Sequence, residues 1–210
     1  MMDTQGNHTH GEDGVTDGLT EKFIRREEIY DGAVLHVVRD EVVLPNGERA
    51  MREFCLHVGA VCILPVTGEG EILMERQFRY AHGRVFFEIP AGKLDSKDED
   101  PLDAAKRELR EETGAVAERW TYLGPIDTTP ALIDERIHLY LAEGLRFGER
   151  ELDEDEFLSV ERVPLDTLLD MVMRGEIADS KTQIALLKYS RLLSLKKAEP
   201  ACNQKLRGIS

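Results

Sequence analysis

One glutamate-rich segment, residues 92–115, constrains the fold of this chain more than any other stretch. On a helix over its second half, Glu108, Glu111 and Glu112 would share an arc of about 100°. Like charges at these spacings destabilise an isolated helix by about 0.2–0.5 kcal/mol per pair, so another group must offset them. A hard divalent cation would do so, because Mg²⁺ and Mn²⁺ prefer carboxylate oxygens and keep positions open for water and phosphate.

Local signals on both sides predict where this helix begins and ends. Asp100 suits the N-cap and Pro101 the first helical position, whereas Gly114 supplies the left-handed residue that ends a helix. Arg107 lies one turn before Glu111 and can pair with it. The opposite side of the helix is apolar, through Leu102, Ala105 and Leu109. Because a short apolar run precedes the segment, we predict a strand, a loop and then the helix.

The acidic composition offers an alternative explanation for these glutamates. The chain has 41 Asp and Glu against 27 Lys and Arg, a formal net charge of −14, so the helix could simply present a solvated acidic face. The apolar stripe and the two caps favour a built site instead. The same charge disfavours nucleic acid and anionic membranes as partners, and a polyanionic substrate would need a local cationic or metal site.

Other features predict a cytoplasmic protein. No apolar run reaches roughly 18 residues, the minimum for a membrane span, and the polar N-terminus lacks the apolar core of a signal peptide. The three cysteines suggest no disulfide framework. Cys55 and Cys62 lie in apolar, strand-like segments, where we expect reduced packing residues.

The glutamate-rich segment resembles the Nudix box, the loop–helix signature of hydrolases that cleave nucleoside diphosphates linked to another group. The family pattern is Gly, five residues, Glu, seven residues, then Arg-Glu-aliphatic-any-Glu-Glu-any-Gly-aliphatic. The chain matches it from Glu99 to Ala115, but six residues separate Gly92 from Glu99. The extra residue falls in the polar loop 95–98, where an insertion is tolerated. The resemblance implies an α/β (α+β) fold, an α/β/α sandwich with a mixed sheet, preceded by N-terminal antiparallel strands.

Features outside the box resemble the ADP-ribose pyrophosphatase group in particular. They are an N-terminal strand region leading into 52–61, the stretches 76–80 and 88–95, Pro130, and the C-terminal stretches 157–166 and 175–182. One departure is Thr-Thr-Pro-Ala at 128–131, where many relatives carry Ser-Pro-Gly. The resemblance implies metal-dependent hydrolysis of ADP-ribose to AMP and ribose 5-phosphate by a homodimer.

Diphosphate hydrolysis places charge on the phosphate oxygens, and the box residues can offset it. Metal ions held by Glu108 and Glu112 would neutralise that charge and lower the pKa of a bound water. Glu111 is expected either to ligate the metal or to orient its neighbours. The resemblance adds the backbone carbonyl of Ala91 as a further ligand. Mg²⁺ is the expected cofactor, with Mn²⁺ as the alternative.

Two arginines are candidates for binding the substrate phosphates. Arg79 is the stronger candidate and Arg52 the weaker, because a guanidinium is planar and permanently charged. For both, a surface ion pair is the alternative interpretation. Glu88, on the strand before the box, is expected to face the site and support it.

The general base is expected in the acidic segment 151–156. This segment immediately precedes a predicted strand and resembles the loop that carries the catalytic glutamate in relatives. Glu156 is the first candidate and Glu154 the second. The other acids of the segment are expected to be solvated charges.

We expect four regions along the chain. They are a polar tail at 1–18, a dimer-forming strand region at 19–56, the hydrolase domain at 57–195 and a frayed tail at 196–210. Patterns of apolar residues predict strands over 33–38, 41–44, 50–56, 57–65, 71–78, 84–89, 120–123, 137–141 and 157–163, and helices over 164–173 and 180–195.

Two other functions remain open on the sequence alone. One is hydrolysis of another nucleoside diphosphate derivative, such as a nucleotide sugar. The other is a non-catalytic sensor that binds ADP-ribose or a nucleotide. Because a sensor would usually have lost a box glutamate, and all three are present here, the sequence favours an enzyme.

Overall fold

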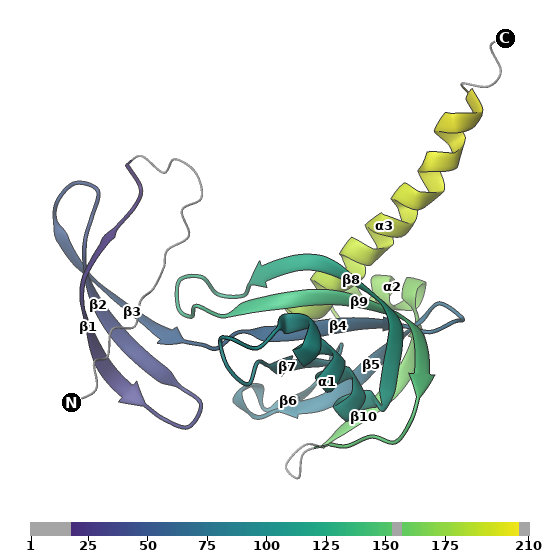
Figure 1. The fold of residues 1–210 in the computed structure, drawn as a ribbon, viewed down its shortest axis with the longest axis horizontal. Coiled ribbons are helices and arrows are strands. Elements are labelled where there is room, and N and C mark those ends of the chain that lie inside the picture. The colour runs from purple at the N-terminus through teal and green to yellow at the C-terminus, as the bar shows by residue number, and fades with distance from the viewer. Residues whose placement is uncertain (1–17, 153–156, 206–210) are drawn as a thin grey trace. The chain divides into compact units, whose positions relative to one another are not determined.

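The computed structural model describes residues 18–152 and 157–205, and their side chains through residue 198 (Figure 1). The chain divides into two compact units, Met1–Cys55 and Leu56–Ser210. Each unit is described by itself below.

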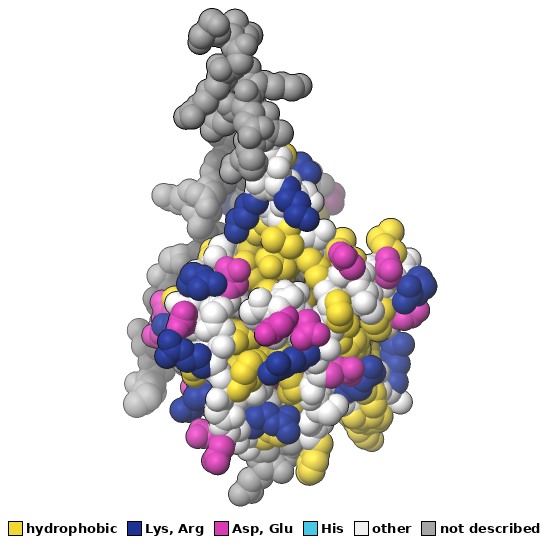
Figure 2. All heavy atoms as spheres, turned by 90° about the vertical axis from the view of Figure 1, so that its right-hand side faces the viewer, with side chains coloured by type: hydrophobic (Ala, Val, Ile, Leu, Met, Phe, Trp, Pro, Cys, Tyr) yellow, Lys and Arg dark blue, Asp and Glu magenta, His cyan; other side chains and the backbone are white. Residues whose placement is uncertain are grey.

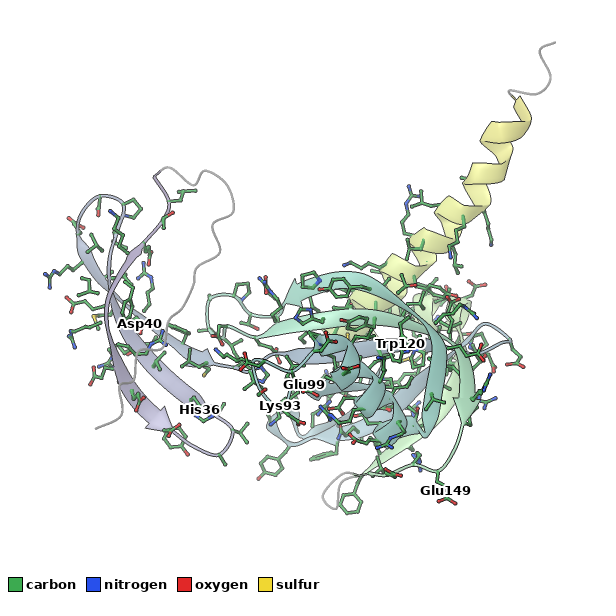
Figure 3. All side chains as sticks on the ribbon, viewed as in Figure 1. His36, Asp40, Lys93, Glu99, Trp120 and Glu149 are labelled. Carbon is green, nitrogen blue, oxygen red and sulfur yellow. The ribbon has the colours of Figure 1, made fainter. Side chains whose placement is uncertain are left out.

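The first unit is a three-stranded sheet of β1 (Lys22–Asp31), β2 (His36–Val43) and β3 (Arg49–Leu56), in that order. β1 and β2 pair antiparallel, as the family resemblance implies for this region, although the apolar pattern predicted no strand over 22–31. The two strands predicted over 33–38 and 41–44 are instead one strand, β2. The adjacent charged residues Arg39 and Asp40 at its centre suggested a break. Asp40, labelled in Figure 3, is however buried and accepts two hydrogen bonds of 2.7 Å from Arg26 on β1. Asp40, paired with Arg26 on the neighbouring strand, therefore interrupts the apolar pattern without interrupting the strand.

The second unit is built on a seven-stranded sheet in the order β10-β5-β4-β9-β8, with β6 on β5 and β7 on β4. Its strands are β4 (Ala60–Val66), β5 (Glu71–Arg79), β6 (Arg84–Glu88), β7 (Ala91–Lys93), β8 (Ala115–Asp127), β9 (Arg136–Phe147) and β10 (Leu158–Pro164). β4 and β9 run parallel, whereas the other pairs are antiparallel, so the sheet is mixed. A 3₁₀ turn, Tyr80–His82, joins β5 to β6.

In the described part of the chain, the two faces of this sheet are covered by α1 (Pro101–Thr113), α2 (Leu165–Met173) and α3 (Ser180–Lys205) (Figure 1). β4 is buried along its whole length and alternates between two cores. Cys62 and Leu64 pack in a core with residues of α2 and α3, whereas Val61 and Ile63 pack with residues of α1. Because successive side chains of a strand point to opposite faces, α1 lies on one face and α2 with α3 on the other. The predicted α/β/α sandwich is confirmed.

Several element boundaries differ from those predicted. β4 begins at Ala60 rather than His57, since Gly59 has a positive φ of 105° and turns the chain. β8 and β9 are longer than predicted, because their outer parts carry polar residues that still pair in the ladder. β7 forms where a loop was predicted, and α3 continues to Lys205. β7 and the outer parts of β8 and β9 form because they pair with a neighbouring strand, and an apolar pattern is not required.

The buried cysteine of β4 behaves as a packing residue. Burial raises the pKa of the Cys62 thiol to about 12, which keeps it protonated and unreactive at neutral pH. Both cysteines whose side chains are described, Cys55 and Cys62, are free thiols. Among the described residues, no helix combines the length and apolar character that crossing a membrane requires.

Candidate active site

The glutamate-bearing helix α1 is capped at both ends as predicted. The Asp100 side chain accepts hydrogen bonds from the backbone N–H groups of Leu102 at 2.8 Å and Asp103 at 3.2 Å. Gly114 ends the helix with φ 69°. A Cβ at Gly114 would lie 2.6 Å from the carbonyl oxygen of Gly148, so both the backbone conformation and the space require glycine.

The short strand β7 places its backbone against the glutamates of α1. Glu108 and Glu112 are buried, with exposed fractions of 9% and 3%. The backbone N–H of Ala91 donates to Oε2 of Glu112 at 3.0 Å. A Cβ at Gly92 would overlap the carboxylate of Glu108, so a larger residue there would displace that side chain. The helix and the strand therefore meet at two buried carboxylates.

Arg107 supplies positive charge beside these acids. Its Nη1 donates to Glu108 Oε1 at 2.7 Å and lies 3.3 Å from Glu111 Oε2, which confirms the predicted pairing with Glu111. Its Nη2 donates to the Lys93 carbonyl oxygen at 3.2 Å and to Glu99 at 3.4 Å. Figure 3 labels Lys93 and Glu99. Burial acts to lower the pKa of Arg107, but the surrounding carboxylates outweigh it and raise the pKa, so Arg107 stays charged.

The loop before α1 contains the extra residue, and the Glu99 side chain holds this loop in place. Oε2 of Glu99 accepts a hydrogen bond of 2.5 Å from the backbone N–H of Asp95, while Oε1 contacts Arg107. The same carboxylate thus closes the loop and ties it to the helix.

The residues around α1 fit a hard divalent cation. Their donors are carboxylate oxygens, and Gly92 leaves space for one of them beside the β7 backbone. Within residues 18–152 and 157–198, no three acidic, His or Cys side chains stand close enough to hold a metal as they are placed. The Arg107 guanidinium contacts Glu108 and Glu111 and offsets their charge in this arrangement. A bound cation would take over that role.

Arg79 is the last residue of β5 and Glu88 the last residue of β6, and their side chains contact each other. Nε of Arg79 donates to Oε1 of Glu88 at 2.8 Å. Glu88 is buried, with 3% of its side chain exposed, whereas 41% of the Arg79 side chain is exposed. Glu88 also accepts a hydrogen bond from Lys181 on α3. The sequence prediction missed Lys181, although the stretch 175–182 that contains it stood out.

The predicted site residues that remain are Arg52, Glu154 and Glu156. Arg52 belongs to the first unit, where its Nη2 lies 2.5 Å from Oε1 of Glu21. Glu154 and Glu156 lie outside the described residues. Just before them, the backbone N–H of Glu151 donates to the carbonyl oxygen of Glu111 at 3.2 Å. After them, β10 begins at Leu158, paired with Gln77 of β5.

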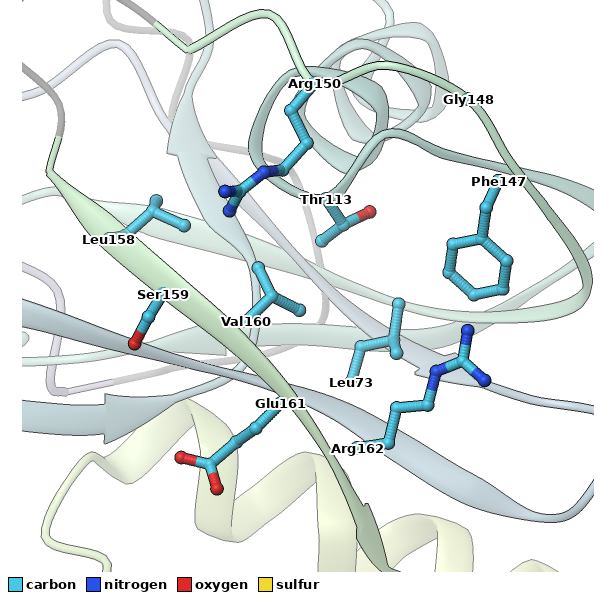
Figure 4. A pocket seen from close by; sticks show the side chains of 10 residues that line it. All are labelled: Leu73, Thr113, Phe147, Gly148, Arg150, Leu158, Ser159, Val160, Glu161 and Arg162. Atoms are coloured by element: carbon cyan, nitrogen blue, oxygen red, sulfur yellow. The ribbon is translucent and has the colours of Figure 1, made fainter.

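A cavity of about 480 Å³ lies near the C-terminal end of α1 (Figure 4). It is lined by Leu73, Thr113, Phe147, Gly148, Arg150, Leu158, Ser159, Val160, Glu161 and Arg162. The guanidinium carbon of Arg162 lies 4.6 Å from the ring centre of Phe147. Among the described residues, none of the predicted site residues lines this cavity.

The surface of the second unit mixes charges of both signs. On the face shown in Figure 2, Lys and Arg side chains are interspersed with Asp and Glu. The cationic groups near the candidate site, Arg79, Arg107 and Lys181, each contact at least one carboxylate. The positive charge of these three groups is therefore offset by neighbouring carboxylates.

Residues 56–184 match the sequence pattern of the NUDIX domain. The chain belongs to the Nudix hydrolase family. This membership agrees with the predicted box, and it brings a general requirement of Nudix hydrolases for a divalent metal.

Three relatives are similar over most of their length. An ADP-ribose pyrophosphatase of Bacillus subtilis is 45% identical over 86% of this chain and 96% of its own. A methanol dehydrogenase activator of Bacillus methanolicus is 44% identical over 79% and 90%. An ADP-ribose pyrophosphatase of Mycobacterium tuberculosis is 40% identical over 75% and 77%. The crystal structure of an ADP compounds hydrolase has the same fold, with a TM-score of 0.75 and 22% identity over 85% of this chain and 97% of its own.

Proposed function

We propose that this Nudix hydrolase cleaves the diphosphate of ADP-ribose, releasing AMP and ribose 5-phosphate. The observation that carries the proposal is the pair of buried carboxylates, Glu108 and Glu112, held against the backbone of β7 at Ala91 and Gly92. The two relatives named ADP-ribose pyrophosphatases support the choice of substrate. Mg²⁺ is the metal we propose, and Mn²⁺ is the alternative.

Glu108, Glu111, Glu112 and the backbone carbonyl of Ala91 would hold the metal. Bound there, the metal would neutralise charge on the phosphate oxygens and lower the pKa of a water molecule. A carboxylate from the segment before β10 would accept a proton from the attacking water. Glu156, or Glu154 in its place, is the proposed base. Described residues on either side support this choice, because the Glu151 N–H donates to the Glu111 carbonyl oxygen of α1 and Leu158 pairs with Gln77 of β5.

Arg79 is the proposed phosphate clamp and Glu88 the residue that orients it. Glu88 engages only Nε of Arg79, so the guanidinium can offer its other donors to phosphate oxygens. Arg52 remains a weaker proposal for the same role. Overall, one water is consumed, a bond between phosphorus and the bridging oxygen breaks, and two phosphate monoesters are released.

A substrate panel tests the proposed function. With Mg²⁺ present, we expect kcat/KM for ADP-ribose to exceed that for NADH, GDP-mannose, diadenosine polyphosphates and 8-oxo-dGTP by at least about 100-fold. Product analysis should give AMP and ribose 5-phosphate, and EDTA should abolish turnover. Preference for another compound would move the substrate to another nucleoside diphosphate derivative. Binding of ADP-ribose without turnover would make the protein a sensor.

We further propose a cytoplasmic homodimer, with residues 19–56 forming the dimer contact and 57–195 the hydrolase domain. The first unit supports this, because it exposes Phe23, Ile24, Ile29, Tyr30, Val34, Leu35 and Met51. Light scattering should then give twice the 23.8 kDa chain mass, and Phe23→Glu should shift it toward one chain. A single-chain mass for the unaltered protein would contradict the dimer. With a net charge of −14, neither nucleic acid nor an anionic membrane is proposed as a partner.

A further inference from the structure

A buried cluster of charges joins the start of α3 to the end of β6. Only 8% of Lys181, the second residue of α3, is exposed. Its Nζ lies 2.5 Å from Oε2 of Glu88 and 3.0 Å from Oδ1 of Asp179. Burial acts to lower the pKa of Lys181, but Asp179 and Glu88 outweigh burial and raise the pKa, so the ammonium stays charged at neutral pH.

The first turn of α3 is fixed in place by hydrogen bonds as well as by charge. Oδ2 of Asp179 accepts from the backbone N–H of Thr182 at 2.9 Å and from its hydroxyl at 2.6 Å. The Thr182 hydroxyl oxygen in turn accepts from the backbone N–H of Ile89 at 3.0 Å. Ile89 directly follows Glu88 in the chain. The ammonium of Lys181 therefore has a fixed position relative to the Glu88 carboxylate.

The Glu88 carboxylate is shared between two cations, one on each oxygen. Oε2 contacts Lys181, and Oε1 accepts from Nε of Arg79. In the part of the chain that the structure describes, the two Nη groups of Arg79 donate no hydrogen bond, and the side chain is 41% exposed. Arg79 is therefore held by one edge of its guanidinium while the other edge is open.

Without Lys181, this division would change. A carboxylate with both oxygens available binds arginine through two parallel hydrogen bonds, using Nε and one Nη together. A buried carboxylate without a compensating cation is costly. Arg79 would therefore bind both oxygens of Glu88. One Nη donor would be withdrawn from the open edge.

We propose that Lys181 is a positioning residue: by occupying Oε2 of Glu88, it keeps both Nη groups of Arg79 available for the substrate's diphosphate. This inference rests on the proposed role of Arg79 as a phosphate clamp. It assigns a task to the stretch 175–182, which the proposed chemistry otherwise leaves without one.

A double-mutant cycle between Lys181→Met and Arg79→Lys tests the inference, with inorganic pyrophosphate and Mg²⁺ as the probe. Calorimetry should show about tenfold weaker pyrophosphate binding in each single variant, since each loses one charge-assisted contact. The double variant should bind no more weakly than Arg79→Lys alone, because Lys181 acts through Arg79. Lys181→Arg should restore most of the affinity, as it returns a cation to Oε2.

Lys188→Met is the matched control. It removes the same charge from the same helix, where Nζ of Lys188 donates to the Leu123 carbonyl oxygen, and it should bind pyrophosphate as the unaltered protein does. If Lys181→Met does not fold, Lys181→Gln enters the same cycle, because it keeps a donor for Glu88 without the charge. Its effect should be smaller and equally absent from the Arg79→Lys background.

Three results would overturn the inference. They are unchanged pyrophosphate binding in the Lys181 variants, additive losses in the double variant, and an Arg79→Lys variant that binds normally. Failure of the proposed substrate is seen separately, in the panel of nucleotides with the unaltered protein. If the cycle is non-additive but the protein prefers another diphosphate, the role of Lys181 stands and ADP-ribose is rejected as the substrate.

Discussion

Replacing Glu112 with glutamine is expected to lower kcat/KM for the diphosphate substrate by at least about 10³-fold. The change removes a negative charge where the proposed metal is held. It preserves side-chain volume and an oxygen that can accept from the Ala91 N–H, a bond of 3.0 Å in the structure. The fold should therefore survive. Steady-state kinetics measure the loss of activity, calorimetric titration with Mn²⁺ should show weaker metal binding, and circular dichroism checks the fold.

Asp103→Asn is the matched control for this variant. Asp103 lies on the same helix, is exposed, and pairs with Lys106 at 2.9 Å. Losing that charge should change kcat/KM by less than about twofold, because exposed pairs are weak and screened. Near-normal activity of Glu112→Gln would show that α1 does not hold the metal, whereas an equal loss in Asp103→Asn would point to a general charge effect.

Replacing Gly92 with alanine is expected to lower kcat by about 10²-fold, since small displacements of catalytic groups have effects of this size. The added Cβ would overlap the Glu108 carboxylate, and the buried side chain must then move away from β7. Its hydrogen bond to Nη1 of Arg107, 2.7 Å long, would be disturbed at the same time. Kinetics with saturating Mg²⁺ measure the effect, and a Mn²⁺ titration reports the change in metal affinity.

Gly68→Ala tests whether any loss is specific to the Glu108 contact. Gly68 lies in the turn between β4 and β5, where an added Cβ meets nothing within 4 Å and the backbone has no positive φ. That variant should keep the activity and melting temperature of the unaltered protein. If Gly92→Ala were equally active, the close approach of strand and helix would have no part in catalysis.

The glutamate-bearing helix shows how much of the site can be predicted from sequence. Its start at Pro101, its end before Gly114 and the pairing of Arg107 with Glu111 all match the predictions. Each depends on residues within about one helical turn of one another, where residue type and spacing decide the structure. The layered fold was predictable for a related reason, because strand and helix periodicities differ and both are visible in the chain.

Predictions were weaker where a residue's environment comes from a distant segment. β2 was divided into two strands because the partner of Asp40, Arg26, lies on another strand. β7 was predicted as a loop because the strand that pairs with it, β4, lies about thirty residues earlier in the chain. In both places, the local apolar pattern is interrupted or short, and pairing with a strand distant in the chain decides where the strand forms.

The sequence by itself determined the family, the capped helix and the types of residue that can hold a metal. These follow from a motif whose members are neighbours along the chain. Only the tertiary structure decided that Glu108 lies against Gly92, and that Glu88 divides its oxygens between Arg79 and Lys181. Glu88 and Lys181 are 93 residues apart, and they meet because α3 packs across the sheet. No periodicity along the chain encodes that contact, since it depends on how separate elements pack into one core.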